Sequence, residues 1–333
     1  MAQRLNSSIT QLLVEGRLPS FDGATEWLNS HPLIGEELRG RVALVQFGTY
    51  TCINWIRTLP YVRAWAQKYE EAGLAVIGVQ TPEFQFEREV AGVRRAFGDM
   101  DIEYPVAVDN DYAVWGAFEN HYWPALYLAD AQGRIRYHHF GEGNYVETEL
   151  AVQQLLAEAG ATGIDTEVVS VVPAGIEVAA DWETLESPEK YLGNQRTDGF
   201  ASPGDVVADE PHVYTFPDFL RHNTWALSGD WTVGRQAALL NAPGGRIACA
   251  FHARDLHLIM RPSVPGSPVR FQVLVDGGLP GAAYGLDIDQ AGGGVLREGR
   301  LYNLIRGASP VTTRRFEIEF LDAGAEVYSF TFG

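Results

Sequence analysis

The stretch that decides the fold is VALVQFGTYTCINW, residues 42–55. Its first six residues form a nearly continuous apolar run, which is typical of a strand buried on both faces of a sheet. A short polar loop follows and leads to Cys52. From residue 53 to 69 apolar residues recur every three or four positions, which predicts an amphipathic helix with a kink at Pro60. The stretch therefore predicts a strand, a loop that carries a cysteine, and a helix.

The rest of the first half continues this alternation of strands and helices. We predict strands at 74–79, 104–108, 125–129 and 135–140, and helices at 83–97, 111–118 and 146–159. Parallel strands joined by crossover helices, followed by an antiparallel hairpin, define an α/β domain over residues 1–160. Its order is that of a thioredoxin-like domain with one insertion at about residues 83–118. Ahead of it we expect a short helix or loose arm at 1–16 and one helical turn at 25–29.

The second half has a different pattern. Residues 161–186 lack periodicity and are predicted to be a linker. From residue 187 to 333 short apolar strands alternate with Gly-rich turns, which predicts an all-β domain, a jelly roll or β-sandwich. Four aromatic residues in this part either stack on sugar rings at the surface or belong to the core: Trp225, Trp231, Tyr284 and Tyr302.

Composition excludes several classes of function. The formal net charge of −18 argues against nucleic acid and anionic membranes as partners. The chain has two cysteines, which cannot form a disulfide framework. We find no signal-peptide pattern at the N-terminus and no apolar stretch of transmembrane length, so we expect a cytoplasmic protein. No His or Cys spacing typical of a metal site occurs, and we expect neither a metal nor another cofactor.

Cys52 is the main candidate for chemistry. A cysteine at a helix N-terminus meets backbone N–H groups and the positive end of the helix dipole, and both favour the nucleophilic thiolate. The alternative is an inert, half-buried cysteine, because a C-x-x-C redox motif requires a second cysteine at position 55, where this chain has Trp55. Trp123-Pro124 precedes a late strand, and we predict a cis peptide bond there.

Several segments resemble the DipZ/TlpA group of thioredoxin-like redox proteins. They are LRGRVALVQFGTYTCINWIRTLPYV (38–62), VIGVQTPEFQFE (76–87), HYWPALYLAD (121–130) and FGEGNY (140–145). SPEKYLG (187–193) and EVYSFTFG (326–333) resemble the DipZ-type C-terminal domain, a β-sandwich similar to a carbohydrate-binding module. The resemblance spans about residues 18–333, and it implies that these relatives are extracytoplasmic.

The resemblance also shows where this chain departs from the family. The family has a cysteine at the position of Trp55, an aromatic residue at that of Gly48, and usually an acidic residue at that of Gln46. Without a second motif cysteine, Cys52 would stop at a mixed disulfide with its substrate. Release would then require an external thiol such as glutathione, or a second protein.

We therefore predict a monothiol thioredoxin-like thiol–disulfide oxidoreductase. Cys52 is its nucleophile, and Pro124 aligns the substrate, as the resemblance implies. The expected substrate is a protein or a low-molecular-weight thiol or disulfide, and the second domain covers part of the first or forms a homodimer. Four residues are expected to line the substrate site: Thr51, Trp55, Trp123 and Glu83. For Glu83 the alternative is a carboxylate at a helix start.

Two further functions stay open. Thr49 lies three residues before Cys52, as in the T-x-x-C pattern of the peroxiredoxin (AhpC/TSA) group, although Val45 replaces the proline of that pattern. A one-Cys peroxidase is thus one alternative, and a redox-inactive binding or scaffold protein is the other. Cys249 lies in an apolar strand pattern and is predicted to be a core residue rather than a resolving thiol.

Overall fold

The computed structural model describes residues 12–33 and 35–333. The chain divides into two compact units, residues 1–177 and 178–333. The division falls inside the segment 161–186 that was predicted to be a linker, and Ile164 and Val169 pack on the core of the first unit. The arm predicted at residues 1–16 lies largely outside the described residues. No helix in the described part of the chain combines the length and the apolar character that crossing a membrane requires.

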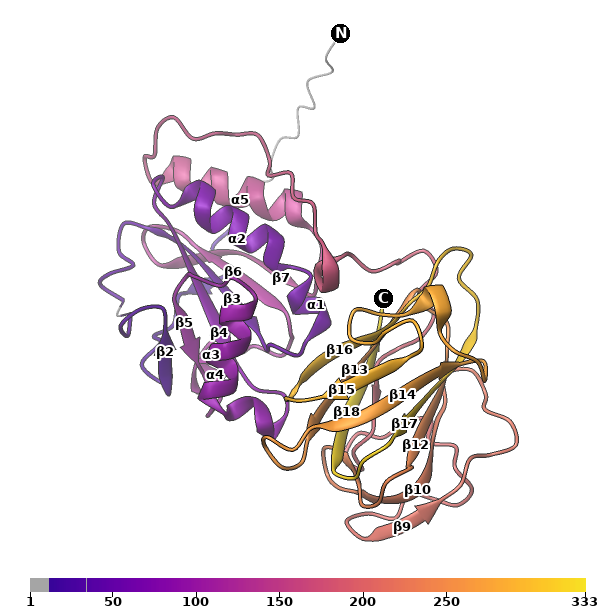
Figure 1. Ribbon diagram of the computed structural model, residues 1–333. Coiled ribbons are helices and arrows are strands. Elements are labelled where there is room, and N and C mark those ends of the chain that lie inside the picture. Colours follow the sequence, from indigo (N-terminus) through magenta and orange to yellow (C-terminus); the bar gives the residue numbers. More distant parts are fainter. Residues whose placement is uncertain (1–11, 34) are drawn as a thin grey trace. The chain divides into compact units, whose positions relative to one another are not determined.

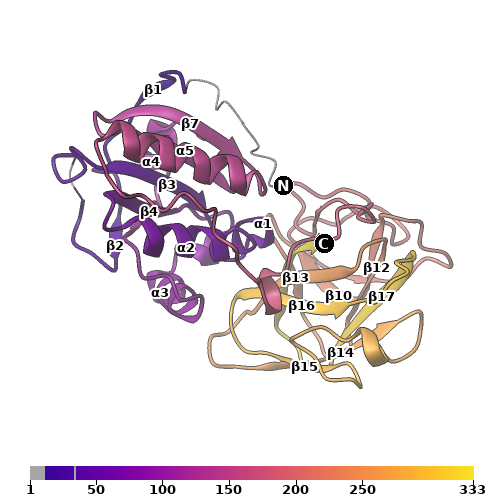
Figure 2. The same ribbon diagram turned by 90° about the horizontal axis from the view of Figure 1, so that it is seen from above.

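Unit 1 is built on one mixed sheet (Figure 1). Its strands, in the order β1-β7-β6-β3-β4-β5-β2, are β1 (Gly16–Arg17), β7 (Arg134–Phe140), β6 (Ala125–Ala129), β3 (Val42–Gly48), β4 (Leu74–Gln80), β5 (Val106–Val108) and β2 (Glu26–Leu28). β3, β4 and β5 are parallel, and β6 runs antiparallel to β3. Figure 2 shows β1 beside β7 at one edge. The predicted thioredoxin-like α/β fold is confirmed.

Helices cover both faces of this sheet. They are α1 (Ile53–Ile56), α2 (Leu59–Tyr69), α3 (Val90–Asp99), α4 (Ala113–Ala117) and α5 (Tyr145–Glu158), with short 3₁₀ segments η1 (Gln85–Arg88) and η2 (Gly175–Glu177). Val42 and Leu44 point to the face covered by α2 and α5, whereas Val45 and Phe47 point to the face covered by α4. Both faces of β3 are therefore buried, as its apolar run predicts.

Helices α2 and α5 lie side by side and share one buried carboxylate (Figure 1). Glu149 on α5 accepts hydrogen bonds from the indole of Trp65 (3.0 Å) and the hydroxyl of Tyr69 (2.6 Å), both on α2. The backbone N–H of Val169 donates to the same carboxylate at 2.8 Å. This carboxylate therefore ties the first part of the predicted linker to unit 1.

Three local predictions for unit 1 are wrong. The helix predicted over 83–97 is split, because the backbone of Glu89 is extended (φ −70°, ψ 102°) between η1 and α3. The segment 25–29 is not a helical turn, because Glu26–Leu28 forms β2 and pairs with β5 at the edge of the sheet. The helix predicted over 53–69 breaks at Arg57–Thr58, and Pro60 sits in the first turn of α2. Proline has no N–H for the preceding turn but fits the start of a helix, so the break falls ahead of it rather than at it.

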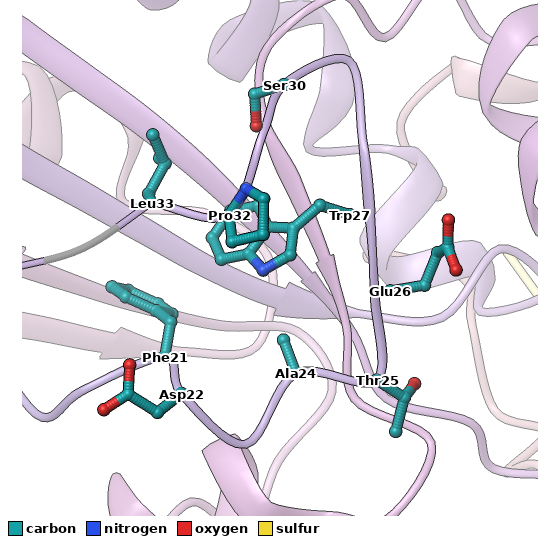
Figure 3. Close-up of a pocket in the computed structure, with 9 residues that line it drawn as sticks. All are labelled: Phe21, Asp22, Ala24, Thr25, Glu26, Trp27, Ser30, Pro32 and Leu33. Carbon is teal, nitrogen blue, oxygen red and sulfur yellow. The ribbon is translucent and has the colours of Figure 1, made fainter.

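A surface pocket of about 530 Å³ lies beside β2 (Figure 3). Its lining comes from the segment that leads into and out of this strand: Phe21, Asp22, Ala24, Thr25, Glu26, Trp27, Ser30, Pro32 and Leu33. None of these is a predicted site residue.

Unit 2 is all-β, as predicted. Its strands are β8 (Lys190–Tyr191), β9 (Pro211–Tyr214), β10 (Trp225–Val233), β11 (Ala238–Leu240), β12 (Arg246–Phe251), β13 (Asp255–Pro262), β14 (Val269–Val275), β15 (Gly293–Leu296), β16 (Arg300–Arg306), β17 (Arg314–Phe320) and β18 (Ala325–Phe332), with a 3₁₀ segment η3 (Gly281–Ala283). The main path runs β15-β14-β17-β12-β10-β11-β18-β13-β16, with β8 on β18 and β9 on β10. All these pairs are antiparallel.

This sheet is one continuous, curved half barrel, and β10 joins its two parts. The first half of β10 pairs with β12, and the second half pairs with β11. Between the halves lies Gly229, whose φ is +101° and where a Cβ would come within 2.8 Å of the Cα of Gly245. Glycine at this point therefore allows the strand to turn from one part of the sheet into the other. The jelly-roll connectivity stays a prediction.

The core of unit 2 contains three of the four aromatic residues that could have stacked on sugars. Trp225 and Trp231 are fully buried and Tyr302 is 1% exposed, whereas Tyr284 is 41% exposed. The core alternative therefore holds for the two tryptophans and Tyr302. The likeness of this domain to a carbohydrate-binding module remains a prediction.

Candidate functional site

The predicted site residues gather at one end of the sheet of unit 1. The loop after β3, the loop after β4 and the loop before β6 meet there, because Gly48 pairs with Gln80 and Phe47 pairs with Ala125. These three loops carry Cys52, Glu83 and the pair Trp123–Pro124. Loops at the carboxyl ends of parallel strands are a common place for ligand and catalytic sites.

Cys52 is the N-cap residue of α1. Its backbone is extended (φ −76°, ψ 110°), its N–H donates to the carbonyl of Thr49 at 3.0 Å, and its carbonyl accepts the N–H of Ile56 at 2.9 Å. Cys52 is half-buried, whereas Cys249 on β12 is 1% exposed. Burial raises the pKa of the Cys249 thiol to about 12. The prediction that Cys249 is a core residue is confirmed, and Cys52 is the more exposed of the two cysteines.

Gln80, the last residue of β4, holds the first part of the loop that carries Cys52 through two hydrogen bonds. Its side-chain carbonyl accepts the N–H of Tyr50 at 3.1 Å, and its amide donates to the hydroxyl of Thr49 at 3.0 Å. Thr49 is fully buried. The hydroxyl of Thr49 is therefore engaged inside the protein, and the peroxidase alternative stays a prediction.

Glu87 on η1 holds the second part of the loop, and sequence reasoning missed it. The hydroxyl of Thr51 donates to one oxygen of Glu87, and the backbone N–H groups of Glu83 (2.5 Å) and Phe84 (2.7 Å) donate to the other. Glu87 is fully buried, and this burial raises its pKa to about 7 although the hydrogen bonds act in the opposite direction. The available signal was an acidic residue inside an aromatic segment, PEFQFE, directly after a buried strand.

Trp55 occupies the interior beside Gly48. The indole is 3% exposed and stacks on Phe97 of α3, with ring centroids 5.4 Å apart and planes inclined by 26°. A Cβ at residue 48 would lie 2.1 Å from Cδ1 of Trp55, far inside van der Waals contact. The two departures from the family pattern are therefore physically coupled, because the indole at position 55 requires a glycine at position 48.

Gln46 lies on the same strand, two residues before Gly48. Its amide donates to the hydroxyl of Thr58 at 2.6 Å, and that hydroxyl donates to the carbonyl of Trp55 at 2.6 Å. Gln46, which stands where the family usually carries an acid, therefore helps to fix the backbone at Trp55 through Thr58.

The predicted cis peptide bond between Trp123 and Pro124 is present. The indole of Trp123 donates to the carbonyl of Thr81 at 3.0 Å, which ties the loop before β6 to the loop after β4. Its ring also packs on the ring of Trp115, with the ring centroids 4.3 Å apart. Trp123 is half-buried and Pro124 is buried.

The four residues expected to line a substrate site differ in their access to solvent. Trp123 and Glu83 are half-buried at the rim, and Glu83 precedes η1, so it does not start a helix. Thr51 is fully buried and Trp55 nearly so. Their substrate-binding role remains untested, and the burial of Thr51 and Trp55 favours a supporting role for these two.

Comparisons with known proteins agree with this architecture. Residues 187–333 match the family model described as the thioredoxin like C-terminal domain. DipZ proteins of Mycobacterium bovis and Mycobacterium tuberculosis are 36% identical over 248 residues, which is 74% of this chain and 35% of theirs. The match therefore covers about a third of the length of these relatives.

Shorter relatives match unit 1. The thiol-disulfide oxidoreductase YkuV of Bacillus subtilis is 28% identical over 141 residues, 42% of this chain and 95% of YkuV. A solution structure of a thioredoxin-like protein in the oxidized form is 30% identical, with a TM-score of 0.40, and covers 43% of this chain and 96% of its own.

The strand order of unit 1 and the site at the end of its sheet define a thioredoxin-fold protein. Similarity to DipZ extends over 74% of the chain, and the C-terminal family model covers residues 187–333. The chain is a homologue of DipZ, with a DipZ/TlpA-like thioredoxin fold followed by the C-terminal domain of this group.

Proposed function

We propose that unit 1 is a thiol–disulfide oxidoreductase that uses Cys52 as its single nucleophilic sulfur. The observation that carries this proposal is the position of Cys52, half-buried at the N-cap of α1 among the loops that hold Trp123 and Pro124. A helix N-terminus favours the thiolate over the thiol. The names of YkuV and of the ResA protein of Bacillus cereus, both thiol-disulfide oxidoreductases, support the same chemistry.

The proposed reaction leaves the chain in a mixed disulfide. The Cys52 thiolate attacks one sulfur of a substrate disulfide, a new S–S bond forms, and the other substrate sulfur leaves as a thiolate. Trp55 stands where a resolving cysteine would lie, and Cys249 is buried in the core of unit 2. An external thiol such as glutathione, or a second protein, then attacks the Cys52 sulfur, forms a new mixed disulfide with it and releases the substrate thiolate. A second equivalent of thiol attacks the external sulfur of that disulfide and releases the Cys52 thiolate, so that two external thiols leave as their disulfide.

The finer features remain predictions. These are the substrate-aligning role of Pro124, the use of glutathione, a homodimer, the cytoplasmic location, and the domain limits at residues 160 and 187. The whole-protein activity of DipZ is not carried over, because this chain matches only 35% of its length.

Alkylation with iodoacetamide across a pH series tests the proposal. We expect one fast modification at Cys52, with a midpoint below about 8.5, the value of a free thiol. Cys52→Ser is expected to abolish it, while Cys249→Ser leaves it unchanged because Cys249 is buried. Oxidised glutathione is expected to add one glutathione to Cys52, and reduced glutathione to remove it, both followed by mass spectrometry.

Three results would argue against this function. A midpoint at the free-thiol value, or no reaction of Cys52 in the folded chain, would support the redox-inactive binding alternative. Reaction with peroxide much faster than with disulfides would support the peroxidase.

A further inference from the structure

Glu87 joins two loops of the candidate site through one buried carboxylate. One of its oxygens accepts the hydroxyl of Thr51, the residue that precedes Cys52. The other accepts the N–H groups of Glu83 and Phe84 in the loop after β4. Glu87 therefore influences the position of Cys52 through the side chain of Thr51 and the peptide bond that joins Thr51 to Cys52.

The surroundings of Glu87 supply hydrogen-bond donors. The groups that shift its pKa, besides burial, are the hydroxyls of Thr49 and Thr51, the N–H of Phe84, and the carboxylate of Glu83. Burial acts most strongly, and the negative charge of Glu83 acts in the same direction as burial. Burial disfavours the charged form of a carboxyl group and therefore raises its pKa above the usual range.

The other titratable and charged groups near Glu87 come from several elements. Arg88 and Glu89 follow it in sequence, and the guanidinium of Arg88 lies 4.0 Å from the carboxylate of Asp111. Tyr50 and Cys52 belong to the loop that Glu87 holds. Asp109, at the end of β5, directs its oxygens to the hydroxyl of Thr81 and to N–H groups at the start of α4.

We propose that Glu87 is a positioning residue for Cys52: it fixes the loop through Thr51, and its negative charge opposes ionisation of the thiol. This inference rests on the proposed function, because it concerns the reactivity of the same sulfur. A negative charge on Glu87 disfavours a second negative charge on the neighbouring loop, so the Cys52 thiol ionises less readily once Glu87 is charged. Ionisation of Glu87 therefore regulates the thiolate near neutral pH.

The pH profile of Cys52 alkylation tests this inference, because a merely structural role would not reshape it. In the wild-type chain the rate is expected to rise with pH less steeply than a single titration, because Glu87 ionises near pH 7 within the same interval. Glu87→Gln keeps the shape of the side chain and removes the charge. We expect it to restore the steepness of a single titration and to raise the rate at pH 7.5 about threefold, because half a pKa unit has that effect on the thiolate fraction.

Matched variants separate charge from packing. Thr51→Val removes the hydroxyl that reaches Glu87, whereas Thr51→Ser retains it. We expect the valine variant to shift the profile and the serine variant to follow the wild type. Glu83→Gln removes a negative charge that raises the pKa of Glu87, so it is expected to move the Glu87 titration to lower pH.

The folded stability gives an independent readout of the Glu87 charge. The pKa of Glu87 is about 7 in the folded chain against 4.5 for the free side chain, so the folded state binds its proton more tightly. The resulting stabilisation is complete below pH 4.5 and is lost as the pH rises through 7. Relative to Glu87→Gln, the wild-type chain is expected to lose stability over this interval in urea unfolding.

The outcomes distinguish the two proposals. If Cys52 reacts but a folded Glu87→Gln chain keeps the wild-type profile, the inference about Glu87 is overturned and the proposed function stands. If Cys52 does not react in the wild-type chain, both fall. If Glu87→Gln fails to fold, the pair Thr51→Val and Thr51→Ser decides, since identical profiles for these two variants overturn the inference.

Discussion

Replacing Gly48 with alanine is expected to lower the free energy of unfolding of unit 1 by about 3 kcal/mol. The new methyl group would overlap the indole of Trp55, whose Cδ1 lies 2.1 Å from the ideal Cβ position. The indole cannot move aside easily, because it is 3% exposed and stacks on Phe97. Urea unfolding, with hydrogen exchange of the β3 amides as the readout for unit 1, measures the loss.

A double-mutant cycle identifies the overlap as the cause. In a Trp55→Ala background, the change Gly48→Ala is expected to cost little, so the coupling energy between the two positions is about 2 to 3 kcal/mol. Gly98→Ala in α3 is the control, because nothing lies within 4 Å of its Cβ position, and it is expected to stabilise by about 0.5 to 1 kcal/mol. Equal costs of Gly48→Ala in both backgrounds would contradict the overlap.

Exchanging the two positions together is expected to convert the site to dithiol chemistry. Trp55→Cys alone supplies the second thiol but empties the space of the indole, which costs about 3 to 5 kcal/mol. Adding Gly48→Trp places an indole in that space from β3, in the pattern that the family resemblance describes. We expect most of the stability to return and the two motif thiols to form an intramolecular disulfide.

Thiol counting and mass spectrometry check this exchange. The oxidised double variant, combined with Cys249→Ser, is expected to show no free thiol, a loss of two hydrogens and no covalent dimer. Cys52→Ser in the same background is the control and is expected to retain one free thiol. A chain that stays reduced under glutathione disulfide, or that forms only mixed disulfides, would show that position 55 does not bring a second sulfur within reach of Cys52.

Much of the fold could be predicted because its signals are local. The apolar run of β3, the helical period after Cys52 and the Trp123–Pro124 pair each predict a feature that the structure contains. One exception is β2, where Glu26–Leu28 pairs with β5 some 80 residues later and becomes the edge strand of the sheet. Pairing at long range overrides weak local preference.

The position of Cys52 at the start of a helix could be predicted from the sequence, but the residues that hold its loop could not. The contact between Thr51 and Glu87 joins residues 36 positions apart, and no spacing rule relates them. Trp55 was expected to face a substrate, since position 55 adjoins the reactive cysteine. Its inward direction depends on the space left by Gly48, and such space is visible only once the strand and helix are packed.

The two cysteines divide between the two units, one in each, and this gives the chain its own reporters of unfolding. Cys52 belongs to unit 1 and is half-buried, whereas Cys249 belongs to unit 2 and is enclosed by its core. A brief pulse of alkylating reagent during denaturation labels Cys249 only in molecules whose β-domain has opened. If Cys52 has the reactivity proposed above, the same pulse is expected to label it from the beginning, and the ratio of the two adducts then measures the opening of unit 2 without any engineered probe.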